Sequence, residues 1–139
     1  MAEPAANRAE ILEAVERVMR CDPQGWNFAI VEGSRRASTN PLDNEFQTFF
    51  VQWARTDEGL DFEAGDPAYS DNPPHSPDVI ARLDELGLEA TDINFKREFQ
   101  FADTEAVTAQ EVADLAYEIL FNLCAIDPAS ELNIHVEDA

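Results

Sequence analysis

The chain has 139 residues, of which 45% are hydrophobic, and a formal net charge of −20 from 29 acidic and nine basic residues. This size and composition are typical of one folded domain. Because nucleic acids and anionic membranes attract lysine and arginine, the charge argues against direct binding to either. The acidity has three remaining explanations: a soluble chaperone-like surface, attraction of a basic partner, or adaptation to a salty cytoplasm.

The amino-terminal part predicts one helix and one strand. Residues 1–6 are expected to be a flexible tail. Apolar side chains recur at helical spacing over residues 7–20 and alternate at strand spacing over residues 26–32. Glycine, serine, asparagine and proline in residues 33–45 then predict a loop.

The next strand, residues 46–55, has apolar side chains on both of its faces. Such a strand is either central in a sheet or turns its second face toward a partner. One face carries Phe46 and Phe50, and the other carries Phe49, Val51 and Trp53.

A turn at residues 57–59 leads into a strand over residues 60–64, and a proline-rich loop is expected to follow. A helix is predicted from a Ser76 cap to Gly87, because serine, proline and aspartate in succession favour a helix start. Its inner face is expected to include Ile80.

The last third of the chain predicts a strand over residues 95–101, a capped helix over residues 108–124 and a short strand over residues 132–136. Arg97 falls among the aromatic side chains of its strand. It would either anchor a carboxylate or pair with one of the many acidic residues. Whether the last strand pairs within the monomer or across a dimer is left open.

The order α-β-β-β-α-β-α, with the last strand added, predicts an α+β fold in which an antiparallel sheet carries helices on one face. One domain is expected over residues 7–136, with flexible tails at 1–6 and 137–139.

No motif indicates chemistry. His75 and His135 are the only histidines, and neither has a partner at metal-ligand spacing. Cys21 and Cys124 are expected to be reduced thiols, and no segment approaches the roughly 20 apolar residues of a membrane span. We therefore expect a cytoplasmic protein without catalytic residues, cofactor or metal. An enzyme using paired carboxylates remains an alternative.

Five segments share a hydrophobic pattern with a known family: Phe49–Trp53, Gly59–Ala64, Leu83–Leu88, Asn94-Phe95 and Val112–Leu123. Their pattern resembles that of the superfamily of type III secretion chaperones and YbjN-like proteins, particularly the peptide-binding TY-Chap domains. The resemblance implies a compact α+β fold, often homodimeric, without catalytic residues. It also implies binding of an extended polypeptide through a sheet edge and shallow apolar pockets.

The sequence therefore predicts a non-enzymatic, chaperone-like domain that binds a protein or peptide through an apolar sheet surface. A structure that places all the predicted contact residues inside the core would contradict that choice of residues. The alternative is an acidic inhibitor, immunity-type protein or nucleic-acid mimic that binds one basic protein. The predicted contact residues are Phe49, Val51, Trp53, Leu60 and Phe62.

Overall fold

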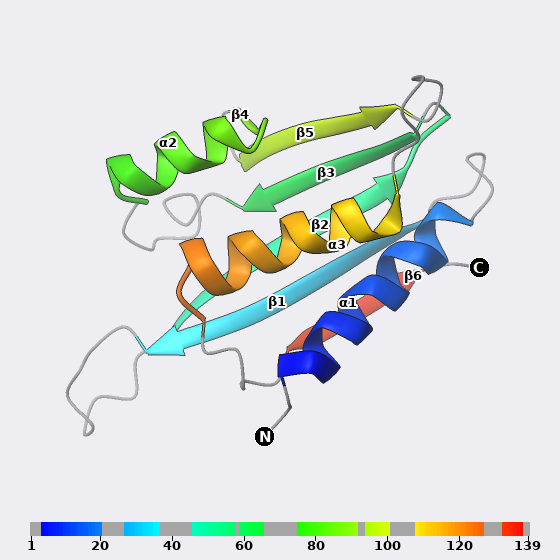
Figure 1. Ribbon diagram of the computed structural model, residues 1–139, viewed down its shortest axis with the longest axis horizontal. Helices are drawn as coiled ribbons and strands as arrows, with labels where there is room; N and C mark the ends of the chain where they lie inside the picture. Colours follow the sequence, from blue (N-terminus) through cyan, green and yellow to red (C-terminus); the bar gives the residue numbers. More distant parts are fainter. Residues whose placement is uncertain are drawn as a thin grey trace.

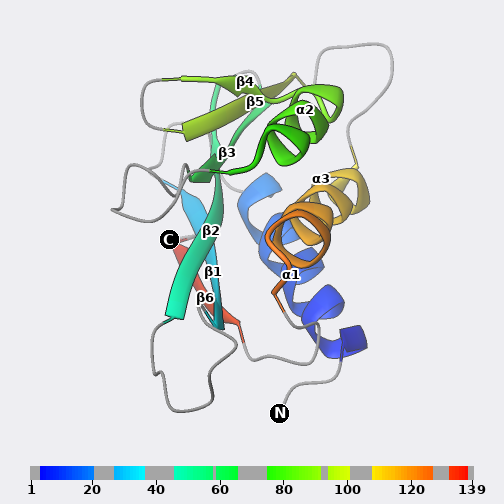
Figure 2. The same cartoon turned by 90° about the vertical axis from the view of Figure 1, so that its left-hand side faces the viewer.

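A sheet of six antiparallel strands and a layer of helices make up the part of the chain that the computed structural model describes (Figures 1 and 2). The described residues are 4–20, 27–36, 46–57, 59–65, 75–91, 94–100, 108–126 and 132–137. The helices are α1 (Pro4–Met19), α2 (Pro77–Glu85) and α3 (Ala109–Tyr117), which continues as the π-helical segment η2 (Glu118–Leu123). The strands are β1 (Phe28–Arg36), β2 (Phe46–Arg55), β3 (Gly59–Gly65), β4 (Glu89–Ala90), β5 (Asn94–Gln100) and β6 (Asn133–Glu137).

The strands follow the order β4-β5-β3-β2-β1-β6, and every neighbouring pair is antiparallel. Figure 2 shows the helices on one side of this sheet. The predicted α+β class, with an antiparallel sheet and helices on one face, is therefore confirmed. The last strand, β6, pairs with β1 of the same chain, from Phe28 opposite Glu137 to Glu32 opposite Asn133.

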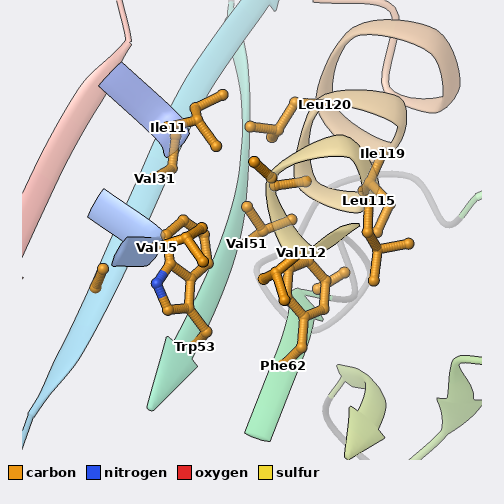
Figure 3. Packing of buried hydrophobic residues seen from close by; sticks show 14 of the residues in the cluster. Ile11, Val15, Val31, Val51, Trp53, Phe62, Val112, Leu115, Ile119 and Leu120 are labelled. Carbon is orange, nitrogen blue, oxygen red and sulfur yellow. The ribbon is translucent and has the colours of Figure 1, made fainter. Parts of the chain in front are cut away.

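The core lies between the sheet and the helices (Figure 3). Alternate residues of β1, β2 and β3 point into it, and α1 and α3 cover them with side chains at helical spacing. Trp53 on β2 stacks against Phe62, its partner on β3, with ring planes 2° apart and centroids 6.1 Å apart. The helical contribution includes Ile11, Val15, Val18, Val112, Leu115 and Leu120, all at most 6% exposed.

Two predicted boundaries at the amino-terminal end differ from the structure. Helix α1 includes residues from Pro4, which were assigned to a tail. Strand β1 continues to Arg36, where composition predicted a loop, since it stays paired with β2 as far as Phe46.

Smaller differences occur later in the chain. Glu137 was assigned to a tail but belongs to β6, and the two-residue strand β4 was not predicted. Residues 66–74 of the loop predicted over residues 65–75, as well as Cys21, Trp26 and Phe101, lie outside the described residues, and Gly65 belongs to β3.

The last predicted helix does not stay α-helical to Cys124. From Glu118 it becomes π-helical, and this wider turn buries three consecutive side chains, Ile119, Leu120 and Phe121. An α-helix rotates about 100° per residue and would turn one of these three away from the core.

Helix α2 is attached to the sheet through its carboxyl end. The Ser76 hydroxyl caps it by accepting a hydrogen bond from the Val79 amide (3.3 Å), as predicted. Ile80 was expected to face inward, but it is 42% exposed. Arg97 donates to the Leu86 carbonyl (3.1 Å), and its guanidinium carbon lies 4.4 Å from the ring centre of Phe99. Arg97 therefore joins α2 to β5.

Candidate partner-binding surface

The residues predicted to contact a partner lie in the core, so that prediction is wrong for the folded chain. Their relative exposures run from 0 to 4%. The physical reason is strand parity. These side chains all point to the sheet face that the helices cover, where β2 and β3 are the central strands. The five residues are Phe49, Val51, Trp53, Leu60 and Phe62.

The alternate residues of the same strands form the opposite side of the sheet, which we call the outer face. Within the described residues no helix lies on this face (Figure 2). Four of its side chains, Phe28, Ile30, Phe50 and Ala54, are apolar and half-buried. The wet face of an antiparallel sheet usually carries polar residues. An apolar group at its centre therefore stands out from the ordinary pattern.

The apolar side chains of the outer face border a hollow of about 530 Å³. Phe28 and Ile30 come from β1 and Ala54 from β2. Gln52, Asp61 and Glu63 add polar groups on the same face. Arg55, which is half-buried, also lines the hollow, so its apolar floor adjoins both carboxylates and a guanidinium.

Phe50 extends the apolar part of the outer face beyond the hollow. Gly65 on β3 lies against its phenyl ring, and the absence of a side chain there leaves room for the ring. A Cβ atom at Gly65 would come within 2.3 Å of that ring. The register of β2 and β3 therefore positions Phe50 over a backbone that only glycine supplies without displacing the ring.

Carboxylates surround the apolar centre. Asp61 and Glu63 on β3 both lie on the outer face, because they pair with Ala54 and Gln52 of β2. Glu63 accepts a hydrogen bond from Gln52. The Lys96 ammonium lies 3.7 Å from Asp61 and 3.5 Å from Glu98. The Asp61 carboxylate is the main cause that raises the pKa of Lys96, so this lysine is charged and neutralises part of the acidic rim.

The opposite side of the apolar centre is also acidic. Glu137 on β6 sits across from Phe28, and its carboxylate lies 2.8 Å from the Nε2 atom of His135. The ring of His135 in turn lies 6.1 Å from that of Phe28. Acidic groups therefore flank the apolar centre on both sides along one row of the sheet.

A second hollow, of about 390 Å³, lies between α1 and the edge strand β6. Glu10, Glu13 and Arg17 come from the helix, and Ile134 and Val136 from the strand. Charged helix residues dominate one wall, so we regard the hollow on the outer face as the stronger candidate for apolar contacts.

The described residues contain no group of three or more histidine, cysteine, aspartate or glutamate side chains arranged to hold a metal ion. The Cys124 side chain is buried. His75 stacks on Phe49 with their ring centres 6.1 Å apart. In the part of the chain that is described, no helix is long and apolar enough to cross a membrane.

Sequence reasoning missed Phe28 and Ile30 as surface residues because their alternation looked like that of a core strand. The signal that could have distinguished the two faces of β1 was the size of the side chains. The intervening residues on β1 are Ala29, Val31 and Gly33, which are small enough to lie directly beneath helices.

A comparison of the chain with protein-family models, with curated proteins and with solved structures finds no match. The α+β class therefore rests on the architecture itself, and the likeness to YbjN-like and type III secretion chaperone-like proteins stays a prediction.

Proposed function

We propose that this chain is a non-enzymatic, chaperone-like domain that binds a peptide or protein partner through the apolar centre of its outer face. The observation that carries the proposal is the position of Phe28, Ile30 and Ala54, half-buried around a hollow on a sheet face without a described helix. Apolar groups gathered in this way are typical of a protein interaction surface. The proposal includes the cytoplasmic location that the sequence predicts.

With the outer face as the binding surface, the contact residues differ from those that the sequence predicted, but the kind of binding is the same. A central strand with apolar residues on two faces can serve the core with one and a partner with the other. In β2 the core takes Phe49, Val51 and Trp53, so Phe50 and Ala54 remain for a partner.

The carboxylates around the hollow favour a second candidate function, an acidic inhibitor or nucleic-acid mimic for one basic protein. Both candidates use the same face, and salt separates them. Apolar contacts persist at high ionic strength, whereas attraction between surface charges weakens as the Debye length shrinks.

A pair of matched substitutions tests the proposal. Ile30→Gln removes an apolar group from the outer face, whereas Ile80→Gln makes the same change on α2, where Ile80 is 42% exposed. We expect the native protein to bind the neutral dye Nile red and to delay aggregation of a heat-unfolded protein. Both activities should fall in Ile30→Gln and persist in Ile80→Gln.

The dye is neutral because an anionic probe would be repelled by a surface of net charge −20. Circular dichroism and urea denaturation check that both variants stay folded. The proposal is wrong if the native protein shows neither activity, or if the two substitutions reduce both activities equally.

A further inference from the structure

We infer that the outer face binds a basic polypeptide segment, in which one apolar side chain enters the hollow and an arginine or lysine on each side meets the carboxylates. The inference rests on the proposed function and adds the chemistry of the partner. Its basis is the position of the acidic groups relative to the apolar centre.

The register of the sheet places these groups in one row. From β6 to β3 the row reads Glu137, Phe28, Ala54 and Asp61, each opposite the next. Neighbouring strands lie about 4.8 Å apart, so the first and last members are about 14 Å apart. Acidic groups therefore bracket the apolar pair at a fixed spacing.

An extended peptide that crosses the strands has a matching repeat. It advances about 3.3 Å per residue, and every second side chain points to the same side. Two side chains four positions apart are thus about 13 Å apart, with a third midway between them. A basic–x–apolar–x–basic segment would place its basic groups over Glu137 and Asp61 and its apolar group over Phe28 and Ala54.

The carboxylates retain the capacity to accept further hydrogen bonds. An ionised carboxylate has two oxygens and about four acceptor sites. The hydrogen bonds and ion pairs described above give Glu63 one donor in Gln52, Asp61 one cation in Lys96, and Glu137 one ring nitrogen in His135. Arginine fits such sites best, because its planar guanidinium can donate two parallel hydrogen bonds to one carboxylate.

The same charges argue against other occupants. Nucleic acids and anionic lipids would meet like charge at Asp61, Glu63 and Glu137. A second copy of this chain, also at −20, would bring two acidic rims together. A basic polypeptide is the occupant whose charge complements both sides of the hollow.

The test uses a fluorescently labelled peptide, Gly-Arg-Ser-Phe-Ser-Arg-Gly with blocked ends, and measures binding to the full chain by fluorescence anisotropy. Two matched peptides replace both arginines by glutamine, or the phenylalanine by serine. We expect the arginine peptide to bind about tenfold more tightly than either matched peptide. High salt should reduce the affinity of the arginine peptide more than that of the glutamine peptide.

Matched protein variants locate the site. Asp61→Asn with Glu63→Gln removes two carboxylates from the outer face. Asp84→Asn with Glu111→Gln removes two from the exposed surfaces of α2 and α3. The first pair should weaken binding of the arginine peptide about tenfold, whereas the second pair should change it less than twofold.

The other outcomes overturn the inference in distinguishable ways. If the arginine and glutamine peptides bind equally, the partner is not selected by charge, although the proposed apolar function survives. If none of the peptides binds, the inference fails, and the Nile red and aggregation measurements decide the proposed function separately. Equal weakening by the two variant pairs would mean that net charge, not this surface, attracts the peptide. If sedimentation shows a dimer, and the Asp61→Asn, Glu63→Gln variant changes the amount of dimer, the occupant is a second copy of this chain.

Discussion

At the scale of single residues, the packing around Gly33 on β1 leaves little room for a side chain. A Cβ atom at this position would come within 2.7 Å of Cδ1 of Ile126 and 3.0 Å of Cδ2 of Leu132. Gly33 therefore leaves space for the side chains of Ile126 and Leu132. From its neighbours in the sequence it is predicted to be a loop glycine, because Ile126 is 93 residues further on.

We predict that Gly33→Ala destabilises the protein by about 1–3 kcal/mol through overpacking. Ile126→Val removes the clashing Cδ1 atom and should itself cost about 0.5–1.5 kcal/mol. The double variant should lose less free energy of unfolding than the two single variants lose together, as measured by urea denaturation. Simple additivity would show that the clash with Ile126 does not determine the cost.

At the scale of elements, the three helices are attached to the sheet to different degrees. Helix α3 buries four side chains, whereas α2, all of whose residues are described, buries only Leu83. Helix α2 also has its Ser76 cap, the contact between Arg97 and the Leu86 carbonyl, the exposed Arg82–Glu118 ion pair and the partly buried Val79. Elements with few buried contacts open locally before the whole protein unfolds.

We therefore predict that Ser76→Ala destabilises α2 by about 1 kcal/mol and acts locally. Hydrogen exchange should become faster at the α2 amides while the global unfolding midpoint changes little. Thr108→Ala removes the matching cap of α3, where the hydroxyl accepts from the Glu111 amide at 3.2 Å. That variant should lower the global midpoint instead. A global effect of the same size in both variants would contradict the weak attachment of α2.

At the scale of the whole molecule, the net charge of −20 sets the electrostatics. Ion pairs such as Arg8–Asp114, Arg82–Glu118 and Lys96–Asp61 offset only a small part of it. These pairs involve partly or fully exposed side chains and each contributes little. Repulsion among the remaining acidic side chains therefore opposes the compact state, and added salt weakens this repulsion.

We predict that the unfolding midpoint rises between about 0.1 M and about 1 M sodium chloride, over which the Debye length falls from about 10 Å to about 3 Å. Urea is the suitable denaturant because it is uncharged. Asp61→Asn, Glu63→Gln, Asp84→Asn and Glu111→Gln combined should reduce this rise. A midpoint that stays flat or falls with salt would show that self-repulsion is not significant.

The sequence alone was sufficient for the class of fold and for most elements. The long strand over residues 46–55 and the caps at Ser76 and Thr108 agree with the structure because these signals are local. Alternation, helical spacing and capping depend on neighbours within a few residues. The acidic character that the proposals use is likewise a property of composition.

Only the tertiary structure decided which face of the sheet is covered. Alternation divides β2 into two faces but does not say which of them the helices meet, and both carry apolar residues. Packing of α1 and α3 buried Phe49 and left Phe50 half-exposed. The pairing of β6 with β1, the space required at Gly33 and the row from Glu137 to Asp61 arise in the same way. Each depends on residues that are distant in sequence and adjacent only after folding.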